Sequence, residues 1–109
     1  MENRHKTESQ LVCDLTAMNT EQRKRYQAVL EHLHKTVQGV EEIENGYAFQ
    51  HDTDASTLLL LAEFISLERL CCPFLDFALV VERERGPVRL RLTGPEGVKQ
   101  FLRAELGFD

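Results

Sequence analysis

The most apolar part of the chain is a helical segment at residues 58–70, and it restricts the possible folds more than any other feature. Its large apolar residues lie on more than one side of the helix: Leu58, Leu59, Leu60, Leu61, Phe64, Ile65, Leu67 and Leu70. Packing on a sheet buries only one side, so the remainder needs another helix or a second copy of the chain. We therefore expect a homodimer formed through this helix.

Local signals mark both ends of the same helix. Thr53 or Asp54 can cap its first turn with a side-chain oxygen. Pro73 lacks a backbone N–H and disfavours helical dihedral angles at Cys72, so the helix should end at Cys71 or Cys72. Two adjacent thiols are thereby placed at the end of an apolar helix.

Two further helices are predicted from amphipathic spacing and capping residues. The first is capped by Asn19 and ends before Gly39. The second is capped by Thr93 or Gly94, has proline in its first turn, and ends at Gly107. Both have one apolar side, which is typical of helices that cover a sheet.

Alternating apolar residues predict five strands, over residues 10–15, 40–44, 47–51, 75–81 and 88–92. The dipeptide Asn45-Gly46 favours a type I′ turn between the second and third strands, although the pattern leaves open which side of this hairpin is buried. In the first strand, Cys13 shares a side with Leu11 and Leu15, so it should face the core.

The order of these elements predicts an α+β fold in a single domain over residues 10–109, preceded by a disordered tail over residues 1–9. Its first six elements match the β-α-β-β-α-β, or ferredoxin-like, open sandwich, which a further strand and a C-terminal helix would extend. In that topology the first strand and the second helix run in the same direction. Cys13 should therefore lie at the same end of the domain as Cys71 and Cys72.

These three cysteines and Glu68 are the candidate metal ligands. Glu68 stands three and four residues before Cys71 and Cys72, so on a helix it lies beside both thiols. Convergent thiolates suit a soft ion such as zinc, copper(I), mercury or trivalent arsenic, held by Cys71 and Cys72 with Cys13 or Glu68. The alternative is that the thiols are core residues, since free cysteine is often buried. The helix C-terminus and Glu68 should both raise the thiol pKa.

The segment Glu68-Arg69-Leu70-Cys71-Cys72-Pro73-Phe74, with Phe77 three residues further on, carries the motif E-x-x-CCPF-x-x-F. It resembles a segment of small uncharacterised bacterial proteins and of the C-terminal extensions of some MerR-type metal-responsive regulators. No winged-helix DNA-binding region precedes it here, so no transcriptional role follows. The resemblance implies a link to heavy-metal or metalloid handling and points to Glu68, Cys71 and Cys72.

Composition limits the other function classes. The net charge of −5 disfavours nucleic acid as a partner, and the longest apolar run is too short to cross a membrane. Three cysteines, an odd number, cannot all pair within one chain, which favours the reducing cytoplasm. We expect a domain that binds a soft metal or metalloid ion for sequestration, transfer or sensing. The alternatives are a thiol-dependent enzyme (an oxidoreductase or a carbon-metal lyase) and a dimeric interaction module without catalytic activity.

Overall fold

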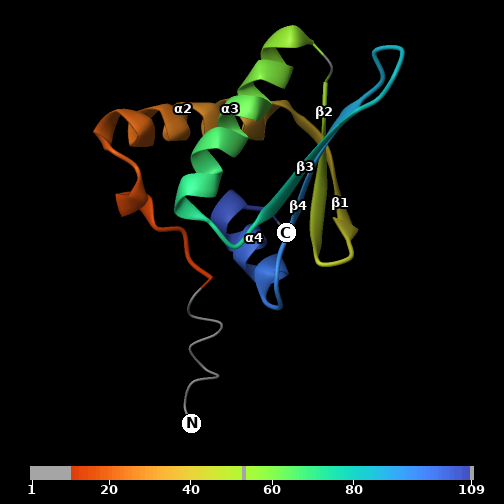
Figure 1. The fold of residues 1–109 in the computed structure, drawn as a ribbon. Helices are drawn as coiled ribbons and strands as arrows, with labels where there is room; N and C mark the ends of the chain where they lie inside the picture. The colour runs from red at the N-terminus through yellow and green to blue at the C-terminus, as the bar shows by residue number, and fades with distance from the viewer. Residues whose placement is uncertain (1–10, 53, 109) are drawn as a thin grey trace.

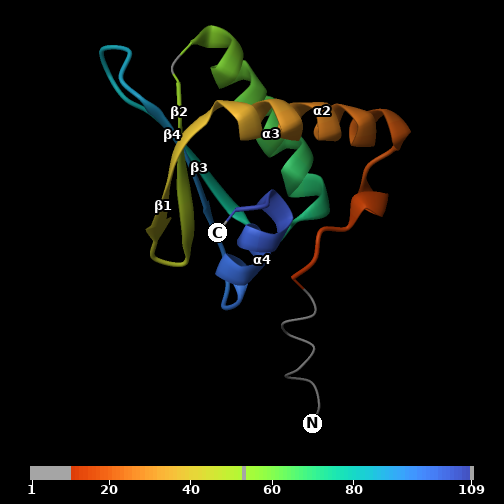
Figure 2. The same ribbon diagram turned by 180° about the vertical axis from the view of Figure 1, so that it is seen from behind.

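A computed structural model describes residues 11–52 and 54–108, so the tail expected over residues 1–9 lies outside the described part. Its elements are η1 (Leu15–Ala17), α2 (Thr20–Thr36), β1 (Val37–Ile43), β2 (Gly46–His51), α3 (Ala55–Cys71), β3 (Asp76–Val81), β4 (Val88–Thr93) and α4 (Val98–Leu106). The strands form an antiparallel sheet in the order β1-β2-β4-β3. All three α-helices cover one face of this sheet (Figures 1 and 2). The α+β class is confirmed.

The strand expected over residues 10–15 does not form in residues 11–15, which the structure describes. Residues 11–14 form no strand, and Leu15 begins the short helix η1, whose N-cap Asp14 accepts a hydrogen bond from the Thr16 N–H. The central place that a ferredoxin-like sheet gives to its first strand is taken by β4, which pairs with both β2 and β3. The ferredoxin-like arrangement is therefore not confirmed.

Helix starts follow capping chemistry where no strand competes for the same residues. α2 begins after Asn19 with a reciprocal capping box to Gln22, as its sequence predicts. The expected cap of α4 at Thr93 or Gly94 is wrong, because Thr93 is still paired within β4. The helix starts instead after Gly97, whose φ of 93° is a left-handed conformation, and it ends at Gly107 as expected.

The β1–β2 hairpin forms as predicted but with a different turn. Ile43 pairs with Gly46, so Glu44 and Asn45 make the tip, and of the two expected turn residues only Asn45 has a positive φ, 66°. A type I′ turn at Asn45-Gly46 is thus wrong. Gly46 is needed for a different reason: a Cβ at this position would lie 1.9 Å from the carbonyl oxygen of Leu92 on β4.

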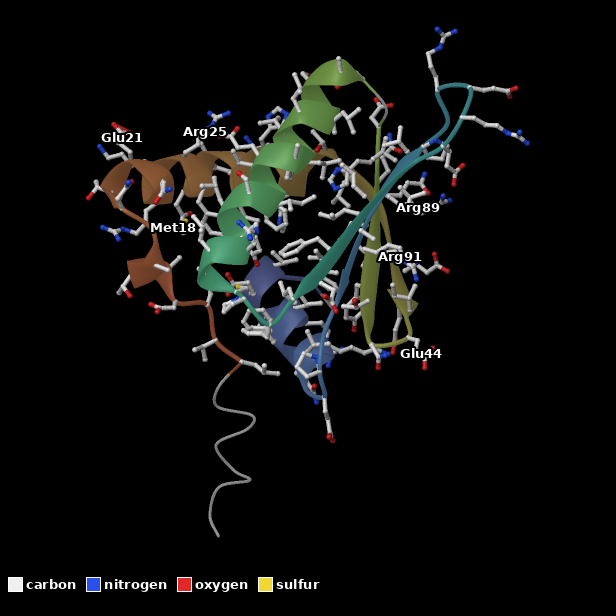
Figure 3. The ribbon with its side chains drawn as sticks, in the orientation of Figure 1. Met18, Glu21, Arg25, Glu44, Arg89 and Arg91 are labelled. Atoms are coloured by element: carbon white, nitrogen blue, oxygen red, sulfur yellow. The ribbon has the colours of Figure 1, made fainter. Side chains whose placement is uncertain are left out.

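The side of the hairpin that carries Tyr47 and Phe49 is buried, which answers the question that the sequence left open. Both rings meet the ring of Phe108 edge-on, with centroids 4.9 and 5.4 Å apart. Glu42, opposite Tyr47, forms an ion pair with Lys99 of α4 at 2.8 Å. The other face of the sheet carries Arg89 and Arg91, which point away from the helices (Figure 3).

α3 lies in the middle of the helical layer and is covered from within the chain. Asp54 caps it by accepting from the Thr57 N–H at 2.7 Å, and it ends at Cys71, both as predicted. α2 packs across it, with Tyr26 stacked on Phe64 at 6.4 Å between centroids. Leu59 is its one largely exposed large apolar residue, at 71%. α2 thus covers the side of α3 for which we expected another helix or a second copy of the chain. The homodimer through α3 stays a prediction. No helix in the described residues is long and apolar enough to span a bilayer.

Candidate metal centre

The three cysteines of the chain converge, and we refer to Cys13, Cys71 and Cys72 as the thiol cluster. The Sγ atoms of Cys13 and Cys71 lie 2.7 Å apart, and those of Cys71 and Cys72 lie 3.8 Å apart. All three sulfurs are within 4.8 Å of one another. An ion bound at about 2.3 Å from each sulfur needs sulfurs roughly 4 Å apart. The Cys71–Cys72 pair has this spacing, whereas Cys13 and Cys71 lie closer and would have to separate by about 1 Å to share an ion.

The end of α3 explains why two adjacent cysteines point the same way. In a continuing helix, successive side chains diverge by about 100°. Cys72 leaves the helical conformation, with φ −128° and ψ 70°, while its N–H still donates to the Glu68 carbonyl at 2.8 Å. Pro73 follows and prevents the helix from continuing. The local break thus brings the Cys72 sulfur back beside that of Cys71.

Cys13 reaches the cluster through a backbone contact. The Asp14 N–H donates to the Cys71 carbonyl at 2.9 Å, which places the N-terminal segment against the end of α3. Met18, where this segment turns into α2, is 1% exposed and anchors it in the core (Figure 3). The predicted proximity of Cys13 to the other thiols is confirmed, although the strand from which we inferred it does not form.

Behind the thiols lies a buried carboxylate with two partners. Glu68 is fully buried; its Oε1 accepts from the Tyr26 hydroxyl at 2.7 Å and its Oε2 from the Cys72 thiol at 3.4 Å. The Tyr26 hydroxyl is also 3.2 Å from a carboxylate oxygen of Glu105 on α4. Glu68, Cys72 and Glu105 form a second group of possible ligand atoms, which shares Cys72 with the first.

Sequence reasoning missed Tyr26 and Glu105. Tyr26 is a buried residue of α2, and its hydroxyl was the available signal, because a buried hydroxyl needs a hydrogen-bond partner. Glu105 carried no such signal, since its contact with Tyr26 spans 79 residues of sequence.

Burial is the main reason why the pKa values of the thiols and of Glu68 are raised. It raises the pKa of all three thiols, and the charge of Glu68 raises the pKa of Cys71 and Cys72 further. Burial also raises the pKa of Glu68, against the hydrogen bonds from Tyr26 and Cys72, which lower it. Among the described residues, no lysine, arginine or histidine makes a hydrogen bond or ion pair with the thiol cluster or with Glu68. The unliganded thiols are therefore protonated near neutral pH.

One side of the thiol cluster is open to solvent through a cleft. This cleft, of about 620 Å³, lies between residues 11–15 and α4, and its lining includes Cys13, Glu105, Leu11 and Phe101. Cys13 is partly exposed, whereas Cys71 and Cys72 are fully buried. An ion from solvent would consequently meet Cys13 first.

Comparison with protein-family models, with curated proteins and with solved structures finds no match for this chain.

The Glu68→Gln variant should gain stability relative to the wild type as the pH rises. The folded state holds the Glu68 proton more tightly than the unfolded chain, so wild-type stability falls above the ordinary pKa of 4.5. Each unit by which folding raises this pKa is worth about 1.4 kcal/mol. Urea denaturation of both proteins from acid to neutral pH measures the difference in free energy of unfolding.

Glu63→Gln is the matched control on the same helix. An exposed ion pair with Arg25 lowers the pKa of Glu63, so this variant should lose relative stability as the pH rises. A Glu68→Gln difference that does not change with pH would contradict the burial of an ionisable carboxyl at this position.

Proposed function

We propose that this protein binds a soft metal or metalloid ion through the thiolates of Cys13, Cys71 and Cys72. The observation that carries the proposal is the convergence of every cysteine in the chain on one point, from segments 58 residues apart in sequence. Cysteines that served only as small core residues would have no reason to gather with sulfur facing sulfur. The sequence resemblance to metal-responsive proteins agrees with the proposal.

The chemistry of the donors favours soft ions. Thiolate sulfur prefers zinc, copper(I), mercury and trivalent metalloids to hard ions such as magnesium or calcium. Ion binding also deprotonates thiols whose pKa is raised, because coordination favours the thiolate. A thiol enzyme needs the opposite environment, with a positive group that lowers the pKa of its nucleophile. Binding is therefore better supported than thiol catalysis.

The surroundings of the cluster suit a protein that loads and releases its ion. Two buried thiols would retain the ion, and the partly exposed Cys13 would exchange it with solvent or with another thiol through the cleft. Because free thiols persist in reducing compartments, we assign this role, sequestration or transfer, to the cytoplasm.

An anaerobic titration tests the proposal. Wild-type protein is mixed separately with zinc(II), copper(I), mercury(II) and arsenite, in excess glutathione to remove ions bound by a single sulfur, and bound ions are counted by native mass spectrometry. We expect one equivalent of at least one soft ion, and its loss in Cys71→Ser/Cys72→Ser. Glu63→Gln, with all thiols intact, should retain it. A folded wild type that retains none of these ions, or equal binding by the double variant, would contradict the proposal.

A further inference from the structure

We propose that the preferred ligand of the thiol cluster is a trivalent metalloid of the arsenite or antimonite class, held as a neutral tris-thiolate. This inference depends on the proposed function and specifies its ligand. The number of donors and the charge of the surroundings support it, and the proton balance of the binding reaction supplies its test.

The number of donors matches a three-coordinate ion. Trivalent arsenic and antimony carry a lone pair and take three sulfurs in a pyramid, whereas a structural zinc ion almost always has four protein ligands. The carboxylates do not complete a fourth position for the cluster, since Glu68 and Glu105 group with Cys72 and not with Cys13 or Cys71. The described residues thus offer three close sulfurs and no fourth ligand common to them.

Charge also favours a trivalent ion. Three thiolates carry −3, so a divalent ion leaves −1 and copper(I) leaves −2, whereas a trivalent metalloid gives a neutral complex. Burying an unpaired charge is costly, and no cationic side chain of the described residues makes a hydrogen bond or ion pair with the cluster. The neighbouring carboxylate of Glu68, itself fully buried, would further oppose a negative complex.

The proton balance separates the two kinds of ion. Arsenous acid reacts as As(OH)₃ + 3 RSH → As(SR)₃ + 3 H₂O: three As–O bonds break, three As–S bonds form, and each departing hydroxide takes one thiol proton. The oxidation state of arsenic does not change. A divalent ion reacts instead as M²⁺ + 3 RSH → [M(SR)₃]⁻ + 3 H⁺, which releases three protons to solvent and leaves a charge of −1 in the buried site. The trivalent metalloid therefore leaves neither free protons nor a net charge at the site.

The pH dependence of binding tests this inference. Dissociation constants for arsenite and for zinc(II) are measured anaerobically between about pH 6 and about pH 8, with a buffered chelator for zinc. Arsenite affinity should change less than about threefold, because no net proton is released. Zinc affinity should rise roughly tenfold per pH unit for each proton released. X-ray absorption of the arsenic-loaded protein should show three As–S bonds.

Two variants test whether Cys13 is the third sulfur ligand. Cys13→Ser should leave two As–S bonds and weaken arsenite binding at least about tenfold, whereas Glu63→Gln should bind as wild type does. Tighter zinc than arsenite binding across the whole pH range, or two As–S bonds in the wild type, would overturn the inference while leaving soft-metal binding intact. Failure of every soft ion to bind would instead overturn the proposed function.

Discussion

Saturation with arsenite should raise the midpoint of thermal unfolding by roughly 15 °C or more. A ligand that binds only the folded state at 1,000 times its dissociation constant adds about 4 kcal/mol to the free energy of unfolding. In a domain of this size each kcal/mol shifts the midpoint by about 4–8 °C. The thiol cluster forms only when residues 11–14 lie against the end of α3, so the unfolded chain lacks the three-sulfur site.

Circular dichroism melts with and without arsenite, in excess glutathione, measure this shift. Cys71→Ser/Cys72→Ser should show almost none of it, and Glu63→Gln should show all of it. An equal rise in the double variant would mean that arsenite stabilises the fold from somewhere other than the thiol cluster.

Replacing Gly46 by alanine should destabilise the fold by about 3 kcal/mol or more, a loss that exceeds most single substitutions. Its Cβ would stand 1.9 Å from the Leu92 carbonyl oxygen and 2.8 Å from the Thr93 Cα, and both are backbone atoms of β4. No side-chain rotation can relieve such contacts, so β2 and β4 would have to separate where they pair at Gly46 and Thr93.

Gly39→Ala is the matched control within the same hairpin. Nothing lies within 4 Å of a Cβ added at Gly39, and its φ is not positive, so we expect a change within about 0.5 kcal/mol. Urea denaturation of the three proteins gives the comparison. Equal losses in both variants would mean that glycine flexibility in the hairpin, and not the close approach of β4, determines the effect.

The local elements could be predicted because their signals lie within a few residues. Asn19 and Gln22 form the capping box of α2, Asp54 caps α3, and Pro73 lies two residues after Cys71, where α3 ends. The turn of the first hairpin was harder, because Gly46 looked like a turn residue. Its actual constraint is the approach of Leu92, which lies 46 residues further along the chain.

Sheet order could not be read from the same patterns. Both residues 11–15 and β4 alternate apolar side chains, and either could have filled the centre of the sheet. The choice depends on non-local pairing: β4 finds partners in β2 and β3, whereas Asp14 bonds to the end of α3. The predicted proximity of Cys13 to Cys71 is still correct, because residues 11–14 lie against the end of α3 even though they form no strand. The Tyr26–Glu68 contact was missed because it joins two helices.

Burial of the thiol cluster also determines how the protein resists oxidation. Peroxides react with thiolates that they can reach, and Cys71 and Cys72 are neither ionised at neutral pH nor exposed. Damage would begin at Cys13, the one partly exposed member. The two deep sulfurs are therefore protected from direct attack, and oxidation reaches Cys71 only through Cys13, whose sulfur lies 2.7 Å away.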